Sequence, residues 1–309
     1  MQAYIITRLF HSVIVVFLVS VLIFGALHLA PGDPLTILLG RQNVSESQIE
    51  EIKKKWGLDR PLYRQYFSWI SNFLRGDFGK SFSYNGIPVK RLVLNRIPNT
   101  AALNLSAYII VLLVGIPVGI ISAVKQYSLL DYFTTSISVL AMSIPNFWLG
   151  LMLLILFSLT LGWLPFFGIQ GWKSFILPSI TVAAMNTAIL MRFTRSNFLE
   201  EIRKDYVNTA KAKGLTQKVI VYKHILRNVA CSLVTLIGYR LAYILSGTIV
   251  VEVVFAWPGV GRLLVNAIFR RDYYVVQAVT FIAALIIVLV NLLTDVSYAF
   301  IDPRIRYDK

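Results

Sequence analysis

Cysteine and charged side chains are scarce in this chain of 309 residues. It has one cysteine, Cys231, which excludes the disulfide framework that stabilises many small secreted domains. Only 15% of its residues are charged, against about 25% in an ordinary soluble domain. Hydrophobic residues make up 57%, a composition that excludes intrinsic disorder. So few charges could not cover a soluble fold with this much apolar surface, which indicates a membrane protein.

Six apolar stretches are long enough, or nearly long enough, to cross a bilayer. A hydrocarbon core of about 30 Å requires about 20 residues of helix. The stretches are 9–30, 101–124, 133–161, 175–195, 229–251 and 275–301. The first is too long for the apolar core of a signal peptide, so we expect it to remain as a helix. We predict an all-α, polytopic membrane protein with six transmembrane helices.

Basic residues set the predicted orientation. Residues 192–228 carry nine basic and three acidic side chains, whereas the loop between the third and fourth stretches has only Lys173. Cytoplasmic loops are enriched in Lys and Arg, so we expect 192–228 and both termini to be cytoplasmic. Residues 31–98 then lie outside, although they are basic, because charge does not dictate the sidedness of loops longer than about 60 residues.

The net charge of +15 has two interpretations. It could indicate a nucleic-acid-binding surface, but no basic segment stands apart from the membrane-bound loops as a separate domain. Cytoplasmic loops of membrane proteins also concentrate Lys and Arg and contact anionic lipid. We therefore expect contacts with membrane lipid and no nucleic-acid partner.

Glycine and proline interrupt several predicted spans, at 115–119, Pro145 and Gly150. Within lipid, a helix break requires neighbouring helices or a water-filled cavity to satisfy the freed backbone groups. Ordinary kinked packing and a pathway lined by the kinks are both compatible with this pattern. Pro145 is therefore one candidate for lining a pore or gate.

Residues 31–98 have the pattern of a small folded insert. A capping box before Ile49 predicts a helix that stops at Gly57. Asp59 as N-cap and Pro61 in the first turn predict a second helix, which ends at Gly76. Its apolar stripe consists of Leu62, Tyr66, Trp69, Ile70 and Phe73. Such a stripe is typical of packing, and the alternative is a cap over a pore mouth that meets an external protein.

Few ionisable residues fall within the predicted spans. Arg240 and Asp295 lie in neighbouring spans, and we predict that they form a structural ion pair. Glu252 is twelve residues beyond Arg240, too far to pair with it along one helix. His11 and His28 have no nearby carboxylate or cysteine, so we expect no metal site. We find no candidate catalytic residue and no chain of carboxylates for proton coupling.

Nucleotide-binding motifs are also missing from the sequence. No Gly-x-x-x-x-Gly-Lys-Ser/Thr loop occurs, and Gly259-Val260-Gly261 is followed by Leu264 where a dinucleotide loop requires glycine. We therefore expect no cofactor in this chain. If ATP supplies its energy, another chain must provide the ATPase.

The basic loop has the most informative local pattern. Residues 199–213 are predicted to be helical and to end at Gly214, where a positive φ is required. Thr216 can begin a second helix. The small side chains of Ala210 and Ala212 suit close docking against a partner protein. A helix that lies on the lipid surface fits the same pattern equally well.

This loop resembles the coupling motif of ABC importer permeases, Glu-Ala-Ala-x3-Gly-x9-Ile-x-Leu-Pro. Gly214 matches the glycine of the motif, Ala210 its second alanine and Leu226 its leucine. The departures from the general motif are similar to its peptide-permease version. They are Asn208, Thr209, His224 and Arg227, within the segments Asp205-Tyr206-Val207, Thr209–Gly214 and His224–Asn228.

Further segments extend the resemblance over nearly the whole chain. They are Ala30–Pro34, Gly57–Pro61, Gly76–Ser81, Phe255–Arg262, Arg271–Tyr273 and Asp302–Arg304. Their order and spacing resemble the B-type permease subunit of the dipeptide, oligopeptide and nickel importer group. This implies a prokaryotic cytoplasmic-membrane protein with a type I ABC importer fold and no enzymatic activity of its own.

The resemblance also implies a domain organisation and a set of partners. Residues 1–309 would form one transmembrane permease domain, with 31–98 as an extracytoplasmic helical insert and 196–228 as a cytoplasmic coupling loop. The implied partners are a homologous C-type permease, two cytoplasmic ATPases that use ATP and Mg, and an external solute-binding protein. The implied ATPase-coupling residues are Asp205, Thr209, Ala210, Ala212, Gly214, His224, Leu226 and Arg227.

Trp257, Pro258 and Gly259 are implied, with Pro145, to line a pore or gate. The expected substrate is a dipeptide or oligopeptide, and similar permeases carry nickel or metallophore complexes or oligosaccharides. A secondary transporter would instead show inverted repeats and functional intramembrane charge, neither of which we find.

Overall fold

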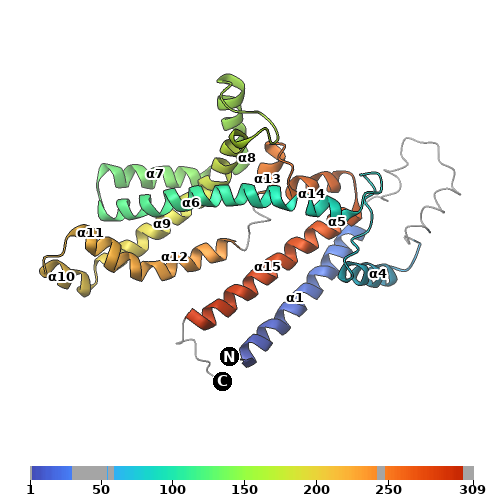
Figure 1. The fold of residues 1–309 in the computed structure, drawn as a ribbon, viewed down its shortest axis with the longest axis horizontal. Helices are drawn as coiled ribbons and strands as arrows, with labels where there is room; N and C mark the ends of the chain where they lie inside the picture. The colour runs from blue at the N-terminus through green and yellow to red at the C-terminus, as the bar shows by residue number, and fades with distance from the viewer. Residues whose placement is uncertain (1, 30–53, 55–58, 242–247, 302–309) are drawn as a thin grey trace. The chain divides into compact units, whose positions relative to one another are not determined.

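The computed structural model describes residues 2–29, 54, 59–241 and 248–301 (Figure 1). Throughout these ranges the regular structure is helical, apart from one isolated antiparallel bridge between Lys80 and Pro88. The predicted all-α class is therefore confirmed. The helix predicted around Ile49 lies outside the described residues.

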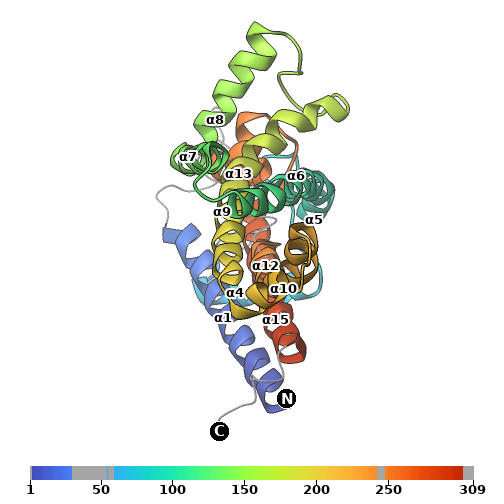
Figure 2. The same cartoon turned by 90° about the vertical axis from the view of Figure 1, so that its left-hand side faces the viewer.

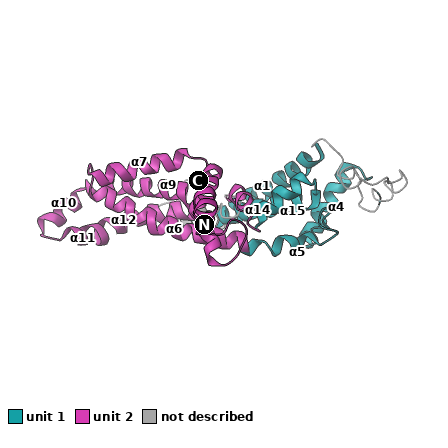
Figure 3. Ribbon diagram, turned by 90° about the horizontal axis from the view of Figure 1, so that it is seen from above, with its two compact units in different colours: residues 1–98, 259–309 teal, residues 99–258 magenta. Residues whose placement is uncertain are grey.

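Contacts divide the chain into two compact units, coloured separately in Figure 3. Unit 1 combines residues 1–98 with 259–309, and unit 2 is residues 99–258. Each unit has its own hydrophobic core.

Unit 1 is built on two long helices that pack along each other, α1 and α15 (Figure 1). An aromatic cluster fills the contact with α4, where the ring of Phe281 lies 4.8 Å from that of Phe73 and 5.5 Å from that of Trp69. The helices that lie entirely in this unit are α1 (Gln2–Leu29), α4 (Leu62–Leu74), α5 (Val89–Leu94), α14 (Val260–Phe269) and α15 (Tyr273–Ile301).

The predicted apolar stripe of α4 is confirmed as packing for four of its five members. Trp69 and Phe73 are buried, and Tyr66 and Ile70 pack against the same core. Leu62 is exposed, and the predicted N-cap at Asp59 is wrong. The helix begins one residue after Pro61, because Pro61 itself has an extended ψ of 143°.

Asp272 ties the described part of the insert to the beginning of α15. This fully buried carboxylate accepts hydrogen bonds from Ser81 Oγ, Ser83 Oγ and Ser83 N. Gly79 packs so closely that an added Cβ would lie 2.8 Å from the Tyr274 ring. Two motifs that are far apart in sequence, Gly76–Ser81 and Arg271–Tyr273, therefore meet in unit 1.

In unit 2, three long helices lie side by side. Figures 1 and 2 show that α6 and α7 run nearly parallel, with α9 packed against α7. The elements with residues in this unit are α6 (Ile97–Val124), α7 (Leu129–Ser143), α8 (Asn146–Leu153), η1 (Leu154–Thr160), η2 (Trp172–Phe175), α9 (Ile176–Ile202), α10 (Asp205–Ala212), α11 (Gln217–Val219), η3 (Ile220–Ile225), α12 (Leu226–Leu241) and α13 (Ile249–Val254).

Five described segments are helical, long and apolar enough to cross a bilayer, and a bent pair makes six when counted as one span. They are Ile6–Leu29, Val89–Val124, Trp172–Ile202, Gln217–Gly238 and Tyr273–Leu293, with Leu129–Ser143 and Asn146–Thr160 as the bent pair. Each overlaps a predicted stretch. Gln217–Gly238 starts before the predicted stretch 229–251 because the more polar segment ahead of that stretch is also helical.

The third predicted span is not one straight helix. It breaks at Ile144 and Pro145, and its two halves meet at 104° (Figure 1). Proline disfavours the helical conformation in the residue before it, and Ile144 is extended with ψ 124°. The interruption predicted at Pro145 is therefore confirmed.

The predicted break at 115–119 does not occur, since α6 continues through Pro117. The two glycines of this segment allow close packing of α6 on α9 instead. A Cβ on Gly119 would lie 2.7 Å from both Met191 O and Thr194 Cβ, and one on Gly115 would lie 3.3 Å from Leu190. These small residues therefore set the approach of the two helices.

Candidate functional site

The coupling segment, residues 205–228, projects from the end of α9 as a helix, a turn and a second helix (Figure 1). The single helix predicted over 199–213 is wrong, because α9 ends at Ile202 and α10 begins at Asp205. Lys204 between them is extended, with ψ 149°. Glu201 stabilises this bend by pairing with Lys204 and accepting a 2.7 Å hydrogen bond from the Tyr206 hydroxyl.

The hydrogen bonds at this bend persist at neutral pH. The hydrogen bond with Glu201 raises the pKa of Lys204, whose ammonium group stays protonated. Burial, together with the hydrogen bond to Glu201, raises the pKa of the Tyr206 phenol. Both groups therefore remain hydrogen-bond donors at the carboxylate near pH 7.

Gly214 closes α10 with a Schellman turn, as its sequence position predicts. Its φ is +74°, a region that residues with a Cβ rarely adopt. Gly214 N donates to Lys211 O at 2.9 Å, and Leu215 N donates to Ala210 O at 3.2 Å. An added Cβ at Gly214 would meet nothing within 4 Å, so this tip is open.

Burial separates an inner and an outer face of the coupling segment. Val207 and Ala210 are buried in one apolar cluster with Ile220 and Ile225. Residues 211–219 are all exposed. Of the predicted coupling residues, Asp205, Thr209, Ala212, Gly214 and Arg227 are exposed, His224 and Leu226 are half-buried, and Ala210 is buried. Ala210 therefore belongs to the apolar core of the segment and not to its exposed face.

The second helix of the segment continues without interruption into α12. It begins at Gln217, after Thr216, and passes through the π-helical η3 before α12 starts at Leu226. Thr216 has the extended backbone of an N-cap but no capping hydrogen bond from its side chain. The sequence pattern did not reveal this continuity, which makes the exposed tip the beginning of the candidate span Gln217–Gly238.

A cavity of about 540 Å³ lies beside the coupling segment. The ends of α6 and α9 line it together with α10, α11 and η3, through apolar residues that include Leu199, Ile202, Val207 and Ile220. Arg203 and Lys211 also line it. The segment is therefore not packed flat against the end of α6.

The turn at 255–259 is the predicted gate region, and it is irregular, as expected. Trp257 is fully buried, where its indole Nε1 donates to Asn99 O at 3.0 Å and its ring lies edge-on to Phe175. Asn99 Nδ2 donates to Pro258 O at 2.9 Å. Trp257 therefore anchors the turn inside unit 2.

The other predicted gate residues differ in exposure. Pro145 is exposed at the bend between α7 and α8, Pro258 is half-buried and Gly259 is buried. Further along α8, Gly150 faces the turn, and an added Cβ there would lie 3.1 Å from the Phe255 ring. The helix that begins after Pro145 therefore packs against the turn.

Glu252 forms a buried polar cluster close to this turn. Thr100 Oγ1 donates to its carboxylate at 2.7 Å and Thr248 Oγ1 at 3.2 Å. Asn104 Nδ2 lies 3.3 Å from Thr248 Oγ1. Sequence reasoning identified Glu252 as an intramembrane charge but not its hydroxyl partners, which come from α6 and from the residue before α13.

The predicted ion pair between Arg240 and Asp295 involves two side chains outside the described set. Arg240 belongs to the backbone of α12, and Asp295 to that of α15. Their pairing stays a prediction.

Sequence reasoning missed another buried carboxylate of unit 2, Asp131 in the first turn of α7. Arg195 of α9 binds it with two hydrogen bonds, from Nε at 2.7 Å and from Nη2 at 2.9 Å. Ser128, whose hydroxyl accepts from Asp131 N, marks the helix start. This Ser-x-x-Asp spacing was the available signal, but Arg195 lies 64 residues away in sequence.

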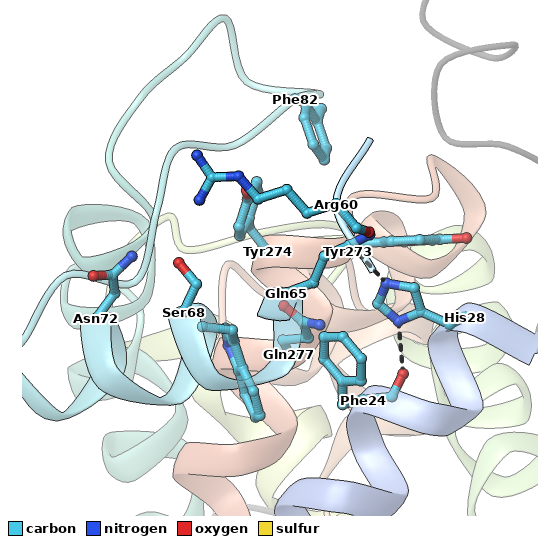
Figure 4. A pocket seen from close by; sticks show the side chains of 11 residues that line it. Phe24, His28, Arg60, Gln65, Ser68, Asn72, Phe82, Tyr273, Tyr274 and Gln277 are labelled. Carbon is cyan, nitrogen blue, oxygen red and sulfur yellow. Dashed lines mark hydrogen bonds between the residues drawn. The ribbon is translucent and has the colours of Figure 1, made fainter. Parts of the chain in front are cut away.

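Unit 1 contains a pocket of about 90 Å³ between α1, α4 and α15, lined by aromatic and polar side chains (Figure 4). His28 occupies one side, with Nδ1 at 2.8 Å from Phe24 O and Nε2 at 3.3 Å from Gln65 Oε1. Gln277 and Asn72 also line it. Ligand sites are usually about 300–1,000 Å³, so this pocket is too small for a peptide.

Comparison with known proteins agrees with these features. Residues 115–307 match a family described as binding-protein-dependent transport system inner membrane component, and residues 1–104 match its N-terminal region. An oligopeptide transport system permease, AppB of Bacillus subtilis, is 39% identical over 99% of this chain and 100% of its own length. A glutathione transport system permease, GsiC of Escherichia coli, is 41% identical with the same coverage.

A solved structure of the MetNI methionine ABC transporter, in an inward-facing conformation, has a related fold. The TM-score is 0.57 at 18% identity, and the match covers 68% of this chain and 96% of that one. This likeness confirms the predicted type I importer fold. Together with the matches along both parts of the sequence, it identifies the chain as a multi-pass inner-membrane protein. The chain belongs to the family of binding-protein-dependent transport system inner membrane components, as a B-type permease of the peptide ABC importer group, which is not an enzyme family.

Proposed function

We propose that this chain forms part of the translocation pathway of an ATP-driven importer for peptides in a prokaryotic cytoplasmic membrane. Relatives named for oligopeptide and glutathione transport, 39% and 41% identical along the whole chain, support a peptide substrate. In this proposal, residues 1–309 form a single transmembrane permease domain. Nickel or metallophore complexes and oligosaccharides are the alternative substrates.

The coupling segment carries this proposal. Its tip is exposed and open around Gly214, its inner face is buried on unit 2, and its second helix continues into α12. A partner that binds the tip would therefore act directly on a candidate membrane span. Alternating access requires such a rigid connection to a two-state element.

The partners follow from the family and from what the sequence contains. A binding-protein-dependent system uses an external solute-binding protein, and we propose that 31–98 faces it. The coupling loop, 196–228, docks on one of two cytoplasmic ATPases, which use ATP and Mg. A homologous C-type permease completes the pathway, and both termini of this chain are cytoplasmic.

The gate is proposed at the turn that includes Trp257, Pro258 and Gly259, together with the bend at Pro145. Support comes from the irregular backbone of the turn and from its contact with α8 at Gly150. Trp257 keeps the turn in place from inside, and an Arg240–Asp295 ion pair would stabilise the neighbouring spans.

Reconstitution in proteoliposomes tests the proposal. We expect labelled dipeptide or oligopeptide uptake only when this chain is combined with its permease partner, both ATPases, the solute-binding protein and ATP with Mg. Uptake of nickel complexes or oligosaccharides in place of peptides would assign one of these alternative substrates to the importer. Uptake by this chain alone, driven by an ion gradient, would contradict the proposal and indicate a secondary transporter.

A further inference from the structure

We propose that Asp131 and Arg195 form the joint through which movement of the coupling segment reaches the bend between α7 and α8. The inference rests on the proposed function, because it assigns a positioning role in ATP-driven transport. It concerns two residues that neither the motif resemblance nor the gate prediction included. Its basis is the geometry of one carboxylate and the helices that meet at it.

The ion pair is well formed and nearly buried. The Arg195 guanidinium makes two hydrogen bonds to the Asp131 carboxylate, at 2.7 and 2.9 Å. Only 4% of the Asp131 side chain and 25% of the Arg195 side chain are exposed. A two-point contact of this kind fixes direction as well as distance, which a single lysine ammonium cannot do.

The Asp131 carboxylate also accepts hydrogen bonds from two other segments of unit 2. Ser122 Oγ of α6 donates to one carboxylate oxygen, and Tyr127 N in the α6–α7 turn donates to the other at 3.0 Å. One side chain therefore connects α6, the turn, α7 and α9. The close packing of Gly119 on Thr194 lies next to it and reinforces the α6–α9 contact.

The position of the joint suits transmission of movement. Arg195 precedes the end of α9 at Ile202 by two helical turns, or about 10 Å along the axis. Beyond that end, α9 leads through the Lys204 bend into the coupling segment. Asp131 is in the first turn of α7, and the other end of α7 is the 104° bend at Pro145.

The contacts continue from this bend to the predicted gate. Gly150 of α8 packs on Phe255, and the turn that follows is held by the hydrogen bond between Trp257 and Asn99. Within unit 2, packed elements therefore join the coupling segment to the turn by way of α9, the ion pair, α7 and α8. We infer that breaking the pair separates ATPase movement from movement of α7 and α8.

A purely structural ion pair is the competing explanation. Buried pairs often add little net stability, because the cost of desolvating two charges offsets their attraction. Stability and coupling must therefore be measured separately. The readout is the number of peptides transported per ATP hydrolysed by the complete importer in proteoliposomes, with the thermal unfolding midpoint of each complex recorded alongside.

The variants are Arg195→Gln, Asp131→Asn, the double variant and the conservative Arg195→Lys. Arg192→Gln is the matched control, because Arg192 lies almost one turn earlier on α9, is exposed and contacts Met142 Sδ at 3.7 Å. We expect a two- to thirty-fold lower transport ratio for Arg195→Gln, which is about the range seen for residues that couple distant sites. Arg195→Lys should fall between it and wild type, and Arg192→Gln should match wild type.

The double variant tests whether the two residues act as one unit. We expect it to be no worse than the more damaging single variant, because neither charge is then left buried and unpaired. Losses that multiply in the double variant would contradict a shared role. If the neutral variants fail to assemble, Arg195→Lys decides the question, because it keeps the charge but loses the two-point contact.

A wild-type transport ratio in Arg195→Gln and Arg195→Lys would contradict the proposed role of the ion pair, whatever happens to the unfolding midpoint. The proposed function has its own control in Gly214→Val, at the tip of the coupling segment. If that variant uncouples transport and the Arg195 variants do not, only the joint fails. If neither affects the ratio, the coupling role of the segment fails.

Discussion

Gly214 shows how one residue can set the shape of a docking surface. Its φ of +74° completes both hydrogen bonds of the Schellman turn, and no neighbouring atom lies within 4 Å of where a Cβ would be. A side chain there would strain the backbone but would not collide with the rest of the chain. Most of its effect on function would therefore come from bulk at the exposed tip.

Replacing Gly214 by valine should uncouple ATP hydrolysis from transport while membrane insertion stays intact. A β-branched residue at positive φ strains the turn by about 1–3 kcal/mol, and its methyl groups project from the tip. The measurement is peptide uptake per ATP hydrolysed in the reconstituted importer, together with the amount of this chain in the membrane fraction.

Gly162 supplies the matched control for this change. Its φ is +64°, it is exposed and its Cβ would also meet nothing within 4 Å, but it lies outside the coupling segment. Gly162→Val should bring similar strain and leave the ratio unchanged. Gly214→Asn should retain most coupling, because asparagine tolerates this conformation. Normal uptake with Gly214→Val would count against a coupling role for the segment.

At the scale of elements, the contact between α6 and α9 depends on the absence of side chains. The Cβ of an alanine at Gly119 would lie 2.7 Å from the Met191 carbonyl oxygen, which is backbone and cannot rotate away. In an unpacked helix the same change would add about 1 kcal/mol of stability, because glycine is a poor helix former. Packing and helix propensity therefore act in opposite directions here.

Gly119→Ala should lower the stability of the chain by about 1–3 kcal/mol, as overpacked cores usually do. Gly25→Ala, in α1, is the control, because nothing lies within 4 Å of its added Cβ. It should leave stability unchanged or raise it slightly. Thermal unfolding of the purified chain in detergent compares the two variants, and equal midpoints would show that α6 and α9 are not in close contact.

Pro117 and Pro145 explain why the spans were predictable from sequence and their shapes were not. Apolar length located every candidate span, because a bilayer requires about 20 apolar residues whatever the fold. Both prolines stood in apolar runs beside small residues. Only one of them breaks its helix, because α6 continues through Pro117 whereas Ile144 before Pro145 is extended. A proline in an apolar run therefore does not by itself determine whether the helix breaks.

In the candidate site, too, some features were predictable from the sequence and others were not. The Gly214 turn was predicted, since a glycine after a helical run and before a new N-cap is a local signal. The bend at Lys204 and the burial of Ala210 were not, because they depend on Glu201 and on the apolar cluster with Ile220 and Ile225. Contacts between residues far apart in sequence, such as Asp131 with Arg195, could not be predicted from local sequence patterns.

For the whole molecule, the sidedness of the membrane is the property on which the proposed mechanism depends. The coupling segment must meet cytoplasmic ATPases, and the segment around Lys54 must face outward. The basic excess over residues 192–228 favours this arrangement. The basic charge of 31–98 opposes it, and only the length of that segment reconciles the two. Orientation therefore needs a direct measurement.

Single cysteines provide this measurement, once the exposed native Cys231 has been replaced by serine. Lys54 and Lys213 are both exposed, so a cysteine at either position is accessible to a maleimide that cannot cross membranes. Lys54→Cys should be labelled in intact cells, and Lys213→Cys only after permeabilisation, because the two positions lie on opposite sides. The Cys231→Ser parent gives the background signal. Labelling in the reverse order would place the coupling segment away from any ATPase, and the proposed mechanism could not operate.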